Sequence, residues 1–171
     1  VRIAASLDAM GARGELIRAG TDWSVIEENR RRMIEECPDV YFEITPTVSI
    51  MNVYHLPDFH KEWIDKGLLE PQNVRMNILT YPTEYRIQII PPTERKKFID
   101  KYTEHIKWID DNFGDGAAKR GFESVLDFLQ QENYENLIPD FIDRNTPLDK
   151  LRGESLYQVA PELKFFRDYE Y

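Results

Sequence analysis

The sequence predicts an α/β protein made of three parallel strand–helix units and an all-helical C-terminal extension. Short apolar segments begin near residues 3, 40 and 74, and helical patterns separate them. Their spacing is roughly 35 residues, which suits strand–helix–strand crossovers of about 30 residues or more. Such crossovers are right-handed and would lay the three strands parallel. From Thr93 onward only helical patterns remain, so we expect two parts, residues 1–91 and 92–171.

The first unit is a short strand followed by a loop and a helix. Residues 2–8 form a short apolar run that turns polar, which is typical of a buried strand. Apolar residues recur at helical spacing over residues 22–37 and would form the buried stripe of a helix. We expect Thr21 to cap this helix and Pro38 to end it.

The second and third units repeat this order. Residues 40–50 are rich in β-branched and aromatic side chains and predict a strand. Pro46 should interrupt that strand, because proline cannot donate to the hydrogen-bond ladder. Pro57 is placed to open the next helix and Gly67 to end it, and residues 74–80 predict the third strand.

The C-terminal extension follows residues 86–90, which we expect to be extended. One helix should run from Thr93 to Gly114, and another should cover residues 119–132. The remaining chain is helical in character, and we expect prolines at positions 139, 147 and 161 to break it. The aromatic tail, residues 165–171, should pack on the body of the protein or on a missing half.

Composition and charge narrow the class of function. The 171-residue chain has a net charge of −9, which repels phosphate backbones, so we do not expect nucleic-acid binding. Its apolar runs are too short to span a bilayer, so we expect no membrane partner. The single cysteine, Cys37, allows neither an internal disulfide nor a four-cysteine metal site. We expect it to be a small buried hydrophobic residue of a cytoplasmic protein.

A series of motifs closes the predicted strands and recurs near the C-terminus. The series is Ser6-Leu7-Asp8-Ala9, Gly14-Glu15-Leu16-Ile17-Arg18, Thr47-Val48-Ser49-Ile50-Met51-Asn52, Asn77-Ile78-Leu79-Thr80-Tyr81-Pro82 and Leu148-Asp149-Lys150-Leu151-Arg152. In this order the motifs resemble those of radical S-adenosylmethionine (radical SAM) enzymes of the twitch or SPASM-like type. The resemblance covers most of the chain and matches the last three barrel strands and the helical extension of that family.

The resemblance implies that residues 1–91 are the C-terminal half of a partial, TIM-like barrel. In that family a CxxxCxxC motif holds a [4Fe-4S] cluster, SAM is cleaved reductively, and the 5′-deoxyadenosyl radical abstracts hydrogen from a substrate. This chain lacks the motif, so we expect SAM and the cluster only in a full-length parent and no catalysis by this chain alone. The expected partner is the missing N-terminal half of the barrel, and the open sheet edge should favour self-association.

Polar residues at the end of the first strand are candidates for ligand binding. Ser6 and Asp8 lie two positions apart, so they point to the same face of an extended chain. Ligands of parallel α/β barrels bind at the C-terminal ends of the strands, where a hydroxyl and a carboxylate can bind ribose hydroxyls. The resemblance implies this role toward SAM. The alternative is that Asp8 caps its own turn.

Arg18 follows the glycine-containing loop of the first unit. A guanidinium can hold a carboxylate through two parallel hydrogen bonds. The resemblance implies that Arg18 meets the carboxylate of SAM. The alternative is a surface arginine paired with Glu15 or Asp22.

The ends of the second and third strands supply the remaining candidates. The amide of Asn52 could contact the adenosyl group, or it could serve as a turn or capping residue. By resemblance, the backbone near Asn77 and Tyr81 meets adenine, although packing is the alternative role for the Tyr81 ring.

The three histidines do not have the spacing of a metal site. His55 and His60 are five positions apart, whereas helical metal ligands lie three or four apart. His105 belongs to another predicted element. We therefore expect no zinc or iron site built from them.

Two other classes of function remain open at this stage. The chain could be a non-catalytic, acidic α/β interaction module that docks on a partner chain, or a small α/β enzyme with a different ligand. Convergence of Asp8, Arg18 and Asn52 on one open cleft would favour ligand binding. Dispersal of these three residues over the surface would favour the interaction module.

Overall fold

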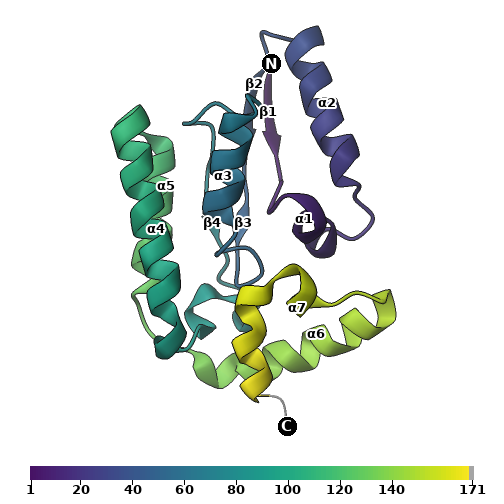
Figure 1. The fold of residues 1–171 in the computed structure, drawn as a ribbon, viewed down its shortest axis with the longest axis vertical. Coiled ribbons are helices and arrows are strands. Elements are labelled where there is room, and N and C mark those ends of the chain that lie inside the picture. The colour runs from purple at the N-terminus through teal and green to yellow at the C-terminus, as the bar shows by residue number, and fades with distance from the viewer. Residues whose placement is uncertain (170–171) are drawn as a thin grey trace.

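The computed structural model describes residues 1–169 and has a mixed α/β fold that is mostly helical (Figure 1). The expected α/β class is confirmed, but the strands of the described residues are short and do not close a barrel. The three expected strand–helix units are not confirmed, because the short strands form two separate pairs. Strand β1 (Arg2–Ala5) pairs in parallel with β2 (Tyr41–Ile44), and β3 (Thr47–Val48) pairs in parallel with β4 (Asn77–Ile78).

Pro46 divides the second predicted strand into two, as the sequence predicts. Strand β2 ends at Ile44 and β3 begins at Thr47, because the proline has no N–H group for the ladder. The two pairs of strands remain connected across this break. A bridge joins Ile44 to Val74, and the Asn77 N–H donates to the Pro46 carbonyl at 3.0 Å.

Two helices connect the parallel strands and pack together through aromatic rings. Helix α2 (Trp23–Glu36) lies between β1 and β2, and α3 (Leu56–Asp65) lies between β3 and β4. The Trp23 ring lies 5.6 Å from Phe59 and 5.5 Å from Trp63, both of α3. Phe59 and Trp63 are fully buried, so this contact anchors α2 to the core.

The ends of α2 differ in two details from the sequence prediction. Asp22, not Thr21, caps the helix, because its carboxylate accepts from the Ser24 and Val25 N–H groups. Cys37 is exposed rather than buried. It occupies the C-cap position, beyond the apolar stripe that faces α3, and so points away from the core.

Residues 86–90 are extended at Arg86 and Ile90 but not between them, contrary to the sequence prediction. They belong to a stretch with two 3₁₀ turns, η1 (Thr83–Tyr85) and η2 (Ile87–Ile89). The buried Arg95 guanidinium explains this conformation, because it donates to the carbonyls of Gln88 at 2.8 Å and Ile90 at 2.9 Å.

The helical extension begins with two long helices beside the sheet. Helices α4 (Pro92–Phe113) and α5 (Ala117–Leu129) lie side by side, and α4 also contacts α3 (Figure 1). The Tyr102 hydroxyl, at the centre of α4, donates to the Val53 carbonyl at 2.8 Å. Within residues 1–169, no helix combines the length and apolar character needed to cross a membrane.

The last segments lie across the carboxyl end of the strands (Figure 1). They are α6 (Ile138–Arg152), α7 (Leu156–Val159) and the 3₁₀ segment η4 (Pro161–Tyr169). Pro147 does not break α6, contrary to the sequence prediction. The helix surface is exposed there, so water can satisfy the carbonyl that the proline leaves free.

The aromatic tail packs on the body of the protein. Phe166 is buried, and its ring centroid lies 4.9 Å from that of Phe141 in α6. The end of the tail, residues 170–171, lies outside the described residues.

One face of the sheet is exposed and polar. Alternate residues of a strand point to opposite faces, and the helix-facing set, such as Phe42 and Ile44, is buried. On the other face Glu43 is enclosed by two exposed arginines, Arg2 at 2.9 Å and Arg75 at 2.7 Å. Parallel sheets are usually covered on both faces, so this open face is a departure from the common pattern.

Candidate functional site

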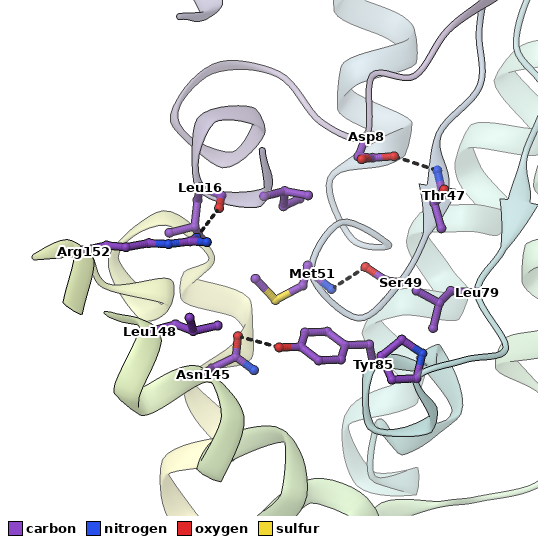
Figure 2. A pocket seen from close by; sticks show the side chains of 12 residues that line it. Asp8, Leu16, Thr47, Ser49, Met51, Leu79, Tyr85, Asn145, Leu148 and Arg152 are labelled. Atoms are coloured by element: carbon purple, nitrogen blue, oxygen red, sulfur yellow. Dashed lines mark hydrogen bonds between the residues drawn. The ribbon is translucent and has the colours of Figure 1, made fainter. Parts of the chain in front are cut away.

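A pocket of about 320 Å³ lies where the strands end, opposite helix α6 (Figure 2). The loops after β1, β3 and β4 form one wall, and α1 (Gly11–Ile17) and α6 form the other. Its polar lining residues are Asp8, Thr47, Ser49, Tyr85, Asn145 and Arg152. The position agrees with the general rule that parallel α/β sheets bind ligands at the carboxyl ends of their strands.

Asp8 is the sequence-predicted site residue that lines this pocket. Its buried carboxylate accepts from the Thr47 N–H at 2.7 Å through Oδ1. Through Oδ2 it accepts from Arg18, from Nε at 2.9 Å and from Nη2 at 2.8 Å. Asp8 therefore links the end of β1 to the start of β3 and to the loop after α1.

Arg18 pairs with Asp8 rather than with either of the partners that the sequence suggests. Glu15 instead accepts from the Trp23 N–H at 2.8 Å, and Asp22 caps α2. The Arg18 side chain is 42% exposed and is not part of the pocket lining. It therefore neutralises Asp8 from behind the pocket wall.

Asn52 is fully buried and joins the ends of two strands. Its Nδ2 donates to the Asp8 carbonyl at 2.8 Å and to the Thr47 carbonyl at 2.9 Å. Its Oδ1 accepts from the Ser49 N–H at 2.8 Å. The amide holds the strand ends in place, in line with the turn-residue alternative.

Three other sequence-predicted residues do not line the pocket. Ser6 and Asn77 are exposed, and Tyr81 is 83% exposed. The structure thus brings Asp8, Arg18 and Asn52 together and leaves Ser6, Asn77 and Tyr81 apart from them.

Helix α6 contributes to the pocket, although none of its residues is a sequence-predicted site residue. The Tyr85 hydroxyl donates to Asn145 Oδ1 at 3.3 Å, and burial raises the pKa of Tyr85. Arg152 Nη1 donates to the Leu16 carbonyl at 3.2 Å. Asn145, Leu148 and Arg152 are spaced three and four apart, which places them on one helix face. That spacing is the signal that could have identified them.

The arrangement of the lining suits a ligand with both polar and apolar parts. Asp8, Thr47 and Ser49 form a polar end that can accept hydrogen bonds from hydroxyl groups. Met51 and Leu79 belong to the apolar wall beside it (Figure 2). The volume is at the lower end of the range for small-molecule sites, which is about 300–1,000 Å³.

The residues of this chain do not fit a [4Fe-4S] cluster. A cluster takes several thiolates, and Cys37 is the single cysteine, located at the end of α2. Within residues 1–169, no three His, Cys, Asp or Glu side chains are placed to hold a metal ion. No reaction step through a cluster can therefore be assigned to these residues.

His60 and His105 meet inside the protein, although the sequence places them in different elements. His60 Nδ1 lies 2.9 Å from His105 Nε2, and His60 Nε2 lies 2.9 Å from the Pro71 carbonyl. The carbonyl requires a donor, so His60 Nε2 carries a proton and His105 donates to Nδ1. Burial lowers the pKa of His60 to about 4 and that of His105 to about 3. Both rings are neutral near pH 7.

Comparisons of the chain with protein-family models, with curated proteins and with solved structures found no match. The resemblance to radical SAM enzymes therefore stays a prediction from the ordered motifs.

Proposed function

We propose that this chain supplies the SAM- and substrate-binding strand ends of a radical SAM enzyme and is inactive alone. The position of Asp8 in a pocket at the carboxyl ends of parallel strands carries this proposal. The resemblance assigns contacts with SAM to Asp8, Arg18 and Asn52. In this fold Asp8 lines the pocket, and Arg18 and Asn52 hold Asp8 in place from outside it.

The pocket has groups that suit the adenosyl part of SAM. An ionised carboxylate has about four acceptor positions. The bonds from Thr47 and Arg18 leave Asp8 with acceptor capacity for a ribose hydroxyl. The neighbouring Ser49 side chain adds a hydroxyl, and Met51 offers an apolar surface for a flat base.

The open sheet face supports the proposal that a further part of a barrel completes this one. In a barrel, the strands of the missing N-terminal half would enclose the polar face around Glu43. The parent enzyme would then cleave SAM with a cluster held by that other part. This chain would orient the adenosyl group and shape part of the substrate pocket.

Binding of S-adenosylhomocysteine, the stable analogue of SAM, tests the proposal. We expect millimolar concentrations to shift the NMR amide signals of Ser49 and Met51 in a saturable manner. Asp8→Asn should weaken binding about tenfold or more, because it removes a charged acceptor. Asp65→Asn removes an exposed carboxylate outside the pocket and serves as the matched control.

Two results would contradict the proposal. The first is the absence of any shift at about 10 mM analogue, which corresponds to negligible affinity. The second is unchanged affinity in both Asp8→Asn and Ser49→Ala. The serine variant leaves the Asp8–Arg18 pair intact, so it remains informative if Asp8→Asn does not fold.

The alternative function is a non-catalytic interaction module that docks on a partner chain. The exposed face of the sheet and the free edge of β1 favour it, because an unpaired strand edge is a template for another strand. A chain that binds no adenosyl ligand but associates through β1 would match this alternative.

A further inference from the structure

The pocket lining contains one positively charged side chain, Arg152, whose carboxylate partner is distant. Asp8 and Arg152 are the charged residues of its lining, and Asp8 is neutralised by Arg18 at 2.8 Å. For Arg152, the recorded ion pair is with Glu154 at 4.0 Å, and both side chains are partly exposed. At that distance Glu154 does not take up the hydrogen-bond donors of the guanidinium. Arg152 is therefore the cationic group of the lining that an anionic ligand can reach.

Arg152 is held in a position that leaves donors for a ligand. It lies in the last turn of α6, and its Nη1 donates to the Leu16 carbonyl of α1. This bond uses one of the five N–H donors of the guanidinium. Figure 2 shows the side chain beside Leu16, on the side of the pocket opposite Asp8 and Thr47. The remaining donors can bind an anion in the fork geometry typical of arginine.

Apolar side chains occupy the space between the two polar ends. Met51 lies between Arg152 and Ser49 in Figure 2, and Leu148 lies beside Asn145. A matching ligand has an anionic group at Arg152 and a short apolar body. A carboxylate suits the site, because the free N–H donors of the guanidinium can hold its two oxygens through parallel hydrogen bonds.

We propose that the pocket binds a small organic carboxylate and that Arg152 of α6 holds its carboxylate group. This inference deepens the proposed function, on which it rests, by naming the substrate class as a carboxylate-bearing molecule. Arg152 is a specificity-determining residue in this scheme, and the apolar wall receives the part of the substrate next to the carboxylate.

A matched series of ligands tests this inference on the unmodified protein. Hexanoate, hexanol and hexylamine have the same apolar chain and differ in charge. We expect hexanoate to shift the NMR amide signals of Leu16 and Met51 with a dissociation constant in the millimolar range. Hexanol should bind about tenfold more weakly, which is the loss of one charge-assisted contact. Hexylamine should not bind.

Substitutions of Arg152 test whether its positive charge causes the preference for hexanoate over hexanol. Arg152→Gln should make hexanoate bind no better than hexanol, and Arg152→Lys should restore part of the preference. Arg120→Gln is the matched control, because it removes the same charge from an exposed residue outside the pocket. Thermal unfolding of each variant verifies that it is folded.

Two outcomes would overturn the inference: equal binding of hexanoate and hexanol to the unmodified protein, or a hexanoate preference that survives in Arg152→Gln.

Adenosine, which has no carboxylate, separates this inference from the proposed function. Failure of adenosine to bind, with a hexanoate preference that depends on Arg152, would overturn the adenosyl role alone. Adenosine binding without a hexanoate preference would overturn the carboxylate inference alone.

Discussion

At the scale of single residues, the buried side chain of Asn52 joins the end of β1 to the segment that begins at β3. One amide group donates to the carbonyls of Asp8 and Thr47 and accepts from the Ser49 N–H. The group is fully buried, so water cannot replace a lost partner. The position of Asp8 in the pocket therefore depends on Asn52.

Asn52→Ala should lower the free energy of unfolding by about 2–4 kcal/mol, because it leaves buried carbonyl and N–H groups unpaired. Asn112→Ala removes a single exposed side-chain bond to the Trp108 carbonyl and should cost less than about 0.5 kcal/mol. Denaturant unfolding of both variants measures the difference. Equal costs for the two would show that Asn52 has no such bridging role.

The buried histidine pair makes stability depend on pH. The folded pKa values of His60 and His105, about 4 and about 3, lie below the ordinary value of 6.5. Burial is the main cause, and for His105 the neighbouring His60, Lys101 and Lys61 add to it. The unfolded chain therefore binds more protons below pH 6.5. The stabilisation is complete above that pH and is lost as the pH falls toward 4.

We expect the free energy of unfolding to fall as the pH is lowered from 6.5 to 4.5. His105→Gln should make this decrease smaller than in the unmodified protein. Glutamine can still donate to His60 but does not titrate. The substitution should remove at most about 3 kcal/mol of this decrease, given 1.36 kcal/mol per pKa unit. Burial also lowers the pKa of His55, to about 4, so the two proteins must be compared directly. A variant with the same pH profile as the unmodified protein would refute the assignment.

At the scale of elements, a buried ion pair fastens the C-terminal segments to α1. Arg13 donates to Glu162 of η4 at 2.6 Å and 3.0 Å and to the Val159 carbonyl of α7 at 3.1 Å. Both charged side chains are less than one tenth exposed. This contact, together with the bond from Arg152 to Leu16, places α6 against the pocket.

Arg13→Ala should destabilise the protein by about 3–5 kcal/mol, because it leaves the Glu162 carboxylate buried without its partner. We also expect faster amide hydrogen exchange over residues 138–169 than over α3. Arg32→Ala breaks an exposed pair with Glu36 and should cost less than about 1 kcal/mol. An Arg13 variant as stable as the Arg32 variant would mean that the C-terminal segments are held by apolar contacts alone.

At the scale of the whole molecule, the sheet is covered on one face only and has a free edge at β1. The arginines around Glu43 keep the open face polar. Both features suit a sheet that continues into another segment, and both leave strand groups available to a second copy of the chain.

We expect the chain to self-associate through β1 at high concentration, so that the mass from light scattering rises above 20.3 kDa. Ala4→Lys places a charge on the exposed side of β1 and should reduce association. Ala117→Lys makes the same change at an exposed position of α5 and should not. A mass that stays at the monomer value at every concentration would contradict self-association through the edge of β1.

Local patterns predicted the long helices and the strand break at Pro46 but missed α1, because its glycines indicate a loop where Gly11–Ile17 is helical. The predicted helix over residues 22–37 corresponds to α2, Trp23–Glu36, and Pro46 ends a strand as expected. Apolar periodicity, caps and proline act within a few residues, so they can be read from the sequence. Tertiary contacts overrode local signals at Pro147, which stays helical, and at residues 86–90, which fold around Arg95.

Local sequence patterns are enough to predict the α/β class and the polar residues that follow the strands. Only the tertiary structure decided which of those residues meet. Asp8 and Asn52 are 44 positions apart, and Arg152 is 136 positions from the Leu16 carbonyl that it binds. Such contacts depend on strand register and on how helices pack across the sheet, and no local periodicity encodes either. The pocket residues are therefore far apart in the sequence and come together only in the folded chain.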